Sequence, residues 1–189
     1  MNFQHDIEQA LRVLKEGGTI LYPTDTIWGI GCDPTNPDAV RKVYELKQRE
    51  DSKSMLVLID DDFRLPSYID SVPDIAYELI DVADKPLSII YPGAKNLAEN
   101  LVAEDGSIGI RITSDPFCKQ LIRRFNRPLV STSANSSGDS SPAMFSDVSD
   151  RILESIDYVV QWRQDDITPA QASSIIKLDH AGRITIIRK

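Results

Sequence analysis

The chain has 189 residues, of which 41% are hydrophobic and 26% are charged, and its formal net charge is −8. The length suits one domain, and no apolar run approaches the roughly 20 residues of a membrane span. The acidic balance disfavours a stand-alone module that binds RNA phosphates, because such modules carry a basic surface. Two distant cysteines, Cys32 and Cys118, favour free thiols over a disulfide framework or a zinc site. With no visible signal peptide, we expect a cytoplasmic protein.

Hydrophobic patterns and turn residues predict helices and strands that alternate along the chain, which is typical of an α/β fold. Helices are expected at residues 3–16, 37–48, 73–83, 115–125 and 147–156. Strands are expected at residues 19–22, 54–59, 87–91, 107–112, 129–132, 158–162, 174–178 and 184–188. The last two strands would form a hairpin, so the sheet should be mixed. Polar loops at 136–146 and 163–173 are candidates for mobile covers of a site.

The first segment that suggests chemistry is YPTDTIWGIG, residues 22–31. It leaves a strand through a proline and places Thr24, Asp25 and Thr26 at the carboxyl end of that strand, where α/β sheets bind ligands. Its two glycines permit close approach of the backbone. A simple turn between two strands, held by an Asx-type hydrogen bond, explains the segment equally well on local grounds.

Three basic residues are candidates for binding an anion. Lys47 and Arg49 end the second expected helix, where cations commonly just complement the helix dipole. The alternative is a pair of cations that bind one polyphosphate. Arg111 interrupts an apolar strand and shares a face with Ser107 and Gly109, as a clamp for a carboxylate or phosphate would. It could equally extend to solvent from an edge strand.

The run STSANSSG, residues 131–138, follows an expected strand and offers hydroxyls, a carboxamide and backbone N–H groups. Anion-binding cradles are built from such groups, although a Ser/Asn/Gly turn is the simpler interpretation of the run by itself. Motifs of the types HExxH, CxxC, GxGxxG and GxxxxGK[ST] are absent from the sequence. The remaining cations and hydroxyls suit electrostatic work on phosphates more than proton transfer.

Taken together, YPTDT with GIG, K-x-R, S-x-x-x-R and STSAN with Gly138 resemble the YrdC/TsaC family in order and spacing, over roughly residues 5–188. The resemblance implies a twisted mixed parallel and antiparallel sheet with helices on both faces and a deep cationic cavity. It implies one domain over residues 1–189, without the extra C-terminal domain of longer relatives. The implied enzyme is a threonylcarbamoyl-AMP synthase, which converts L-threonine, bicarbonate and ATP into threonylcarbamoyl-adenylate and pyrophosphate. Mg²⁺ would arrive with ATP, and no metal ligand from the protein is expected.

The resemblance also implies roles for individual residues. The catalytic group at the nucleotide would be Lys47, Arg49, Ser133 and Asn135. Further contacts to ATP are implied for Lys53, Ser107, Ser141 and Arg188. Contacts to L-threonine are implied for Thr24, Thr26, Arg111, Ser131 and Ser174, with Arg111 on the carboxylate.

The chain departs from the family pattern at several positions. Glu50 follows Arg49 where many relatives have proline, Leu58 stands in place of a histidine, and the P-G-P-x-T segment is degenerate at residues 84–88. These changes keep two alternatives open: a paralogue that binds RNA (tRNA, double-stranded RNA or the ribosome) or a nucleotide without the synthase reaction, and a carbamoyl-transfer enzyme with another acceptor. For the synthase, the expected partners are tRNA-modification proteins, the product serves the adenosine next to the tRNA anticodon, and the chain would be a monomer or weak dimer.

Overall fold

The order of helices and strands follows the expected alternation. The computed structural model describes residues 3–48 and 55–189. The helices are α1 (Gln4–Lys15), α2 (Pro37–Lys47), α3 (Leu65–Tyr68), α4 (Asp74–Asp81), α5 (Pro116–Phe125) and α6 (Asp150–Ser155). The strands are β1 (Ile20–Tyr22), β2 (Gly29–Gly31), β3 (Leu56–Ile59), β4 (Leu87–Tyr91), β5 (Ile108–Ile112), β6 (Leu129–Ser133), β7 (Tyr158–Val159), β8 (Ser174–Leu178) and β9 (Ile184–Arg188).

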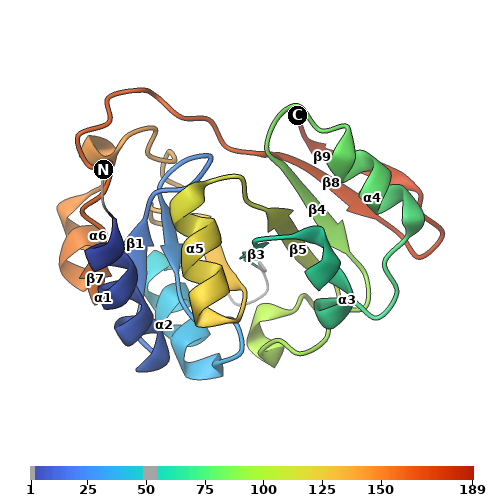
Figure 1. Ribbon diagram of the computed structural model, residues 1–189, viewed down its shortest axis with the longest axis horizontal. Helices are drawn as coiled ribbons and strands as arrows, with labels where there is room; N and C mark the ends of the chain where they lie inside the picture. The colour runs from blue at the N-terminus through green and yellow to red at the C-terminus, as the bar shows by residue number, and fades with distance from the viewer. Residues whose placement is uncertain (1–2, 49–54) are drawn as a thin grey trace.

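The described strands form one nine-stranded sheet in the order β7-β1-β2-β6-β3-β5-β4-β8-β9 (Figure 1). The pairs β1/β7, β3/β5 and β4/β8 are parallel, and the other neighbours are antiparallel. The sheet is therefore mixed, as expected from the terminal hairpin β8/β9. The chain between β7 and β8 crosses from one end of the sheet to the other, so the C-terminal hairpin closes the end opposite to α1 (Figure 1).

Alternation along the strands divides the core between the two faces of the sheet. Ile20 and Tyr22 of β1 pack in a cluster with α1 and α5, whereas Leu21 between them belongs to the cluster on the other face, with α2. Side chains on a strand alternate between faces, so one short strand contributes to both cores. Helices therefore cover both faces, and this confirms the expected layered fold.

Local signals in the sequence fix the ends of the helices that flank the site. The Asn36 carboxamide oxygen accepts hydrogen bonds from the backbone N–H groups of Asp38 (3.0 Å) and Ala39 (3.3 Å), with Pro37 in the first turn. The Asp115 carboxylate caps α5 in the same way, by accepting from Cys118 N at 2.9 Å. These caps set where α2 and α5 begin, and hence where the loops that precede them lie.

Several elements differ from the expected ones. The strand expected at 158–162 ends at Val159, because the backbone N–H groups of Gln161 and Trp162 donate to the Asp6 carboxylate at 3.0 Å each. The short strand β2, within the YPTDTIWGIG segment, and the helix α3 were not expected. None of the helices in the described ranges is both long and apolar enough to span a membrane.

Candidate active site

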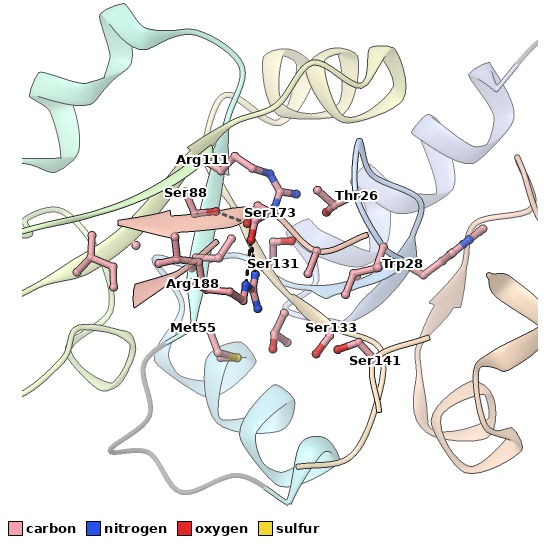
Figure 2. Close-up of a pocket in the computed structure, with 18 residues that line it drawn as sticks. Thr26, Trp28, Met55, Ser88, Arg111, Ser131, Ser133, Ser141, Ser173 and Arg188 are labelled. Carbon is pink, nitrogen blue, oxygen red and sulfur yellow. Dashed lines mark hydrogen bonds between the residues drawn. The ribbon is translucent and has the colours of Figure 1, made fainter. Parts of the chain in front are cut away.

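A cavity of about 240 Å³ opens over the middle strands of the sheet, beyond the end of α5. Six of the residues expected in a site line it: Thr26, Arg111, Ser131, Ser133, Ser141 and Arg188 (Figure 2). They come from segments that are up to 162 residues apart, counted from Thr26 to Arg188. The fold thus brings the separate motifs of the sequence to one place.

Strand register explains why these side chains meet. Leu56 of β3 pairs with Gly109 of β5 on one side and with Ser131 of β6 on the other. Two residues further along β5, Arg111 pairs with Ser88 of β4. Paired residues point to the same face of a sheet, so the five side-chain positions form one continuous wall.

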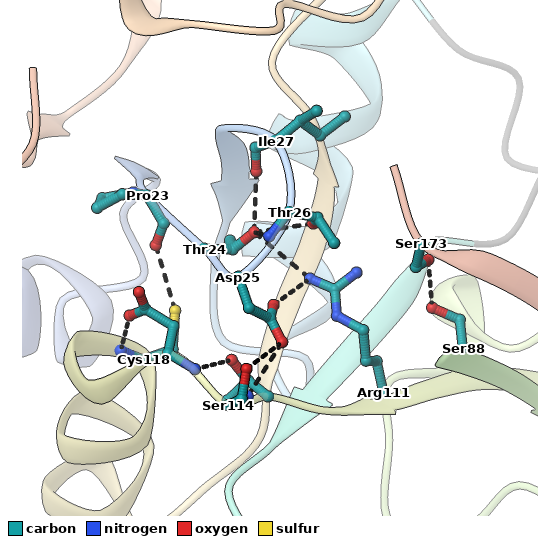
Figure 3. Close-up of polar contacts among 12 residues, drawn as sticks. Pro23, Thr24, Asp25, Thr26, Ile27, Ser88, Arg111, Ser114, Cys118 and Ser173 are labelled. Atoms are coloured by element: carbon teal, nitrogen blue, oxygen red, sulfur yellow. Dashed lines mark hydrogen bonds and ion pairs between the residues drawn. The ribbon is translucent and has the colours of Figure 1, made fainter. Parts of the chain in front are cut away.

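Arg111 is held by an ion pair at the end of this wall. It is only 4% exposed, and its Nη2 lies 3.1 Å from Asp25 Oδ1 and 3.5 Å from Thr24 Oγ1 (Figure 3). Asp25 is itself held, because its Oδ2 accepts from Ser114 N at 3.0 Å and Ser114 Oγ at 3.3 Å. The buried Arg111 Nε–H has no hydrogen-bond partner among the described residues. The guanidinium is therefore fixed in place through Nη2.

Arg188 supplies the second positive charge of the cavity. Its Nε and Nη2 donate to the carbonyl oxygen of Ser173 at 2.9 and 2.7 Å, and Ser173 Oγ shares a hydrogen bond of 2.8 Å with Ser88 Oγ. Burial, and then the charge of Arg111, lower the pKa of Arg188. No described carboxylate lies in ion-pair distance of Arg188, and the described lining residues include no acidic side chain. Two cations thus face one cavity, which favours an anionic ligand.

The two threonines of the TDT segment have different roles: Thr24 supports the turn, and Thr26 lines the cavity. Thr24 Oγ1 donates to Ile27 O at 2.9 Å, accepts from Thr26 N at 2.9 Å and lies 2.9 Å from Thr26 Oγ1. Thr24 therefore holds the turn and does not line the cavity, whereas Thr26 does. Because the single hydroxyl proton of Thr24 goes to Ile27, the proton between the two hydroxyls belongs to Thr26. The Thr26 oxygen keeps lone pairs for a donor in the cavity.

Lys47 is buried behind the cavity instead of lining it. Its Nζ donates to the carbonyl oxygens of Ser133 at 2.5 Å and Asn135 at 2.6 Å, and its own carbonyl accepts from Ser137 N at 2.8 Å. The side chain is 2% exposed. Asn135 Nδ2 in turn donates to Asp139 O at 2.7 Å. Lys47 thus ties the end of α2 to the 133–137 segment, whereas Arg49 and Lys53 lie outside the described residues.

Two other expected contacts are displaced from the cavity. Ser107 precedes β5, and its Oγ donates a hydrogen bond to Asp105 Oδ1 at 2.5 Å. Ser174 does not line the cavity; its neighbour Ser173 does. The register places Ser174 opposite Leu87, so Ser173 and Ile175 point to the cavity face and Ser174 to the other.

Sequence reasoning missed three supporting residues of the site. Ser88 and Ser173 form a hydrogen-bonded pair on the cavity wall, and Asp25 orients Arg111. Alternation along the strand at 87–91 could have placed Ser88 on the polar face. Nothing local to the sequence pairs Asp25 with a residue 86 positions away.

Two further features limit the chemistry. Burial raises the pKa of Cys118 and of Cys32, and Cys118 Sγ donates to Pro23 O at 3.2 Å, so neither thiol provides a ready thiolate. Within residues 3–48 and 55–189, no group of three or more His, Cys, Asp or Glu side chains is arranged to hold a metal ion.

The chain matches a known family. The Sua5/YciO/YrdC family model, described as "Telomere recombination", matches residues 12–189. The threonylcarbamoyl-AMP synthase of Pseudoalteromonas translucida is 34% identical over 163 residues, which cover 85% of this chain and 87% of that protein. Among solved structures, E. coli YciO superposes with a TM-score of 0.84 at 23% identity, over 98% of this chain and 89% of that one.

P. abyssi Sua5 in complex with L-threonine superposes with a TM-score of 0.81 at 22% identity, over 92% of this chain. The match covers 51% of the Sua5 chain, so this chain spans about half the length of that relative. At these identities the superpositions support the fold, whereas the family model and the 34% identical relative establish membership. The chain belongs to the Sua5/YciO/YrdC family.

Proposed function

We propose that this chain is a threonylcarbamoyl-AMP synthase, which makes threonylcarbamoyl-adenylate and pyrophosphate from L-threonine, bicarbonate and ATP. The observation that carries the proposal is the cavity itself. Two arginines and several hydroxyls face it, and the described lining residues include no acidic side chain. The name of the 34% identical relative points to the same reaction.

The end of the cavity with Arg111 and Thr26 is the proposed threonine site. Figure 2 shows these two side chains on one side of the cavity, with Ser131 nearby. A carboxylate would accept charge-assisted hydrogen bonds from the Arg111 guanidinium, whose Nη1 forms no hydrogen bond or ion pair with a described residue. The Thr26 oxygen, with its lone pairs available, would accept from the amine. The complex of Sua5 with L-threonine shows that a protein of this fold binds the amino acid.

The other end of the cavity, with Ser133 and Ser141, is the proposed nucleotide site. Arg188 lies between the two ends in the view of Figure 2. This position supports its assignment to the phosphates of ATP, next to the carbamate. Lys47 contributes by fixing the backbone at Ser133 and Asn135. The proposal assigns the phosphates, with Mg²⁺ brought by ATP, to Arg49 and Lys53 as well.

The chemistry needs positioning and charge neutralisation more than proton transfer. The threonine amine and bicarbonate form a carbamate with loss of water. A carbamate oxygen then attacks the α-phosphate, and the bond from the α-phosphate to the leaving pyrophosphate breaks. Both partners of this attack are anions, so holding them between Arg111 and Arg188 offsets their repulsion. We propose that the labile adenylate passes to tRNA-modification proteins, which transfer the threonylcarbamoyl group to the adenosine next to the tRNA anticodon.

A pyrophosphate-release assay tests the function directly. Purified protein is incubated with ATP, bicarbonate and Mg²⁺, with and without L-threonine, and both pyrophosphate and the adenylate are followed. We expect release that depends on threonine and bicarbonate. Arg188→Met should lower turnover, whereas Arg183→Met, at a side chain that is 84% exposed in the hairpin turn, should not. A folded protein that releases no threonine-dependent pyrophosphate would contradict the proposal, and RNA binding by that protein would favour the paralogue instead.

A further inference from the structure

A second cavity of about 320 Å³ lies at the carboxyl end of β5 and extends over the sheet face opposite to the first cavity. Its floor consists of side chains from alternate positions of β4 and β5: Leu87, Ile89, Ile110 and Ile112. The intervening residues Ser88 and Arg111 face the first cavity. The volume lies within the range of roughly 300–1,000 Å³ that is typical of small-molecule sites.

The rim of this second cavity is polar and carries two free amines. Lys85 follows α4 and Lys119 lies in the first turns of α5. Neither amine has an ion pair or hydrogen bond to another residue of the described ranges. Two carboxylates also reach the rim. Asp25 is neutralised by Arg111, and Asp84 is exposed to solvent. An apolar floor below two unpaired ammonium groups matches a molecule with an apolar body and a carboxylate.

Asp25 connects the two cavities through opposite oxygens of one carboxylate. Its Oδ1 lies 3.1 Å from Arg111 Nη2, which faces the first cavity. Its Oδ2 accepts from the N–H and hydroxyl of Ser114, which lines the second cavity together with Asp25 itself (Figure 3). A ligand that contacts Ser114 therefore acts on the carboxylate that holds the Arg111 guanidinium.

We propose that the second cavity binds a small organic carboxylate with an apolar body, and that its occupancy changes the setting of Arg111 through Asp25. The apolar floor of this cavity lies on the face of the sheet opposite to the proposed threonine and nucleotide sites, and Asp25 is the residue that links the two sides. By linkage, whatever the first cavity binds through Arg111 would alter affinity at the second cavity by the same factor.

Methyl NMR on the full-length chain tests the binding step. The probe is 3-phenylpropionate, with 3-phenylpropan-1-ol as the uncharged control, on protein labelled at isoleucine δ1 methyls. We expect Ile110 and Ile112 to shift on titration, with a Kd of about 1 mM or tighter, as a probe of this size permits. Ile175 in the first cavity should shift little. Absence of shifts at Ile110 and Ile112 would overturn the site, and equal affinity for the alcohol would overturn the carboxylate class.

Charge variants at the rim test the same site, because removal of a positive charge and removal of a negative charge should change the affinity for the probe in opposite directions. Lys119→Met should weaken binding of 3-phenylpropionate about threefold to fivefold, as expected for a partly exposed charge pair. Asp84→Asn removes a like charge from the rim and should strengthen binding. Lys95→Met, at a lysine paired with Asp70 elsewhere, is the matched control and should leave the affinity unchanged. If Lys119→Met binds as tightly as the unaltered chain, the assignment of the anion site is wrong.

The ¹⁵N signal of the Arg111 side-chain Nε–H tests the coupling step without any assumption about the enzyme reaction. The signal is assigned by its loss in Arg111→Lys. We expect it to move as the probe saturates the second cavity, and to move less in Ser114→Ala, which removes the hydroxyl that contacts Asp25. An Arg111 signal that stays in place at saturation would overturn the coupling, even where pyrophosphate release proves the proposed function.

Discussion

Arg111→Lys is the substitution that most directly tests the proposed threonine site. The guanidinium has separate nitrogens for separate tasks. Nη2 faces Asp25 and Thr24, whereas Nη1 forms no hydrogen bond or ion pair with a described residue. A lysine keeps the charge but has one nitrogen, which the Asp25 carboxylate would hold. The donor that we assign to the threonine carboxylate would be lost.

The magnitude follows from that single donor. A hydrogen bond between charged groups contributes about 1.5–3 kcal/mol. By the relation between free energy and affinity, the KM for threonine should rise roughly 10-fold to 150-fold. The KM for ATP should change much less, because Arg111 lies at the opposite end of the cavity from Ser133 and Ser141 (Figure 2). Stability should fall only modestly, since the buried charge of Asp25 keeps a cationic partner.

The assay is pyrophosphate release at varied threonine and at varied ATP, with thermal unfolding as the control for folding. Arg183→Lys, in the exposed pair with Asp179, is the matched substitution and should leave both KM values unchanged. An unchanged KM for threonine in folded Arg111→Lys would refute the assigned role. A KM for ATP that rises in proportion would place Arg111 at the nucleotide.

Three further predictions concern stability. Lys47→Met should lower the unfolding temperature by several degrees, because the partly buried carbonyl of Asn135 would lose the donor that Lys47 Nζ supplies, at about 1–3 kcal/mol, whereas that of Ser133 keeps Asn135 N as a donor; an unchanged unfolding temperature would show that the tie is not structural. Gly31→Ala should cost about 1–3 kcal/mol because the new Cβ would lie 2.7 Å from both Tyr22 Cε1 and Val130 O, whereas Gly29→Ala, with a nearest neighbour at 3.3 Å, should cost less in urea unfolding. Lys177 and then Ser107 lower the pKa of Asp105 to about 2. The ionised carboxylate therefore adds to the free energy of unfolding above pH 4, and this contribution should be lost as the pH falls through 2. Between pH 4 and 2, Asp105→Asn should therefore lose less free energy of unfolding than the unaltered chain. The difference should be less than about 1 kcal/mol, because the pair of Asp105 and Lys177 is exposed.

The helices near the site could be predicted because their signals are local. Asn36 with Pro37 and Asp115 with Pro116 each satisfy backbone N–H groups within three residues, so the sequence of the cap determines the start of the helix. The strand β2 could not be predicted in this way. It has three residues, two of them glycine, and exists because β1 and β6 pair with it on both sides.

The serine at the start of β8 shows how register limits prediction from sequence. The motif suggested Ser174, yet pairing with β4 turns Ser173 toward the cavity. Two adjacent serines give no hydrophobic alternation that would separate them. A shift of one residue reverses the face of every side chain in a strand, and only the tertiary pairing decides it.

Lys47 shows a related limit for cations. Its position at the end of α2 was compatible with solvent, with the helix dipole or with phosphate, and the structure places its ammonium against two carbonyls of the 133–135 segment. The packing partner lies 86 residues away. No local pattern encodes that contact. Lys47 was assigned to the site because of its charge, whereas its described contacts stabilise the 133–135 segment.

The TDT segment explains why a short motif can be more constrained than its ligand contacts require. Only Thr26 lines the first cavity; Thr24 holds the turn by its contacts to Thr26 and Ile27, and Asp25 fixes Arg111. Loss of the Thr24 or Asp25 side chain would affect the ligand indirectly, through Thr26 or Arg111. For Asp25→Asn the loss is also energetic, since removing one member of a buried ion pair costs about 3–5 kcal/mol. A sequence comparison would therefore assign three contact residues to the motif, where the geometry requires one contact and two supports.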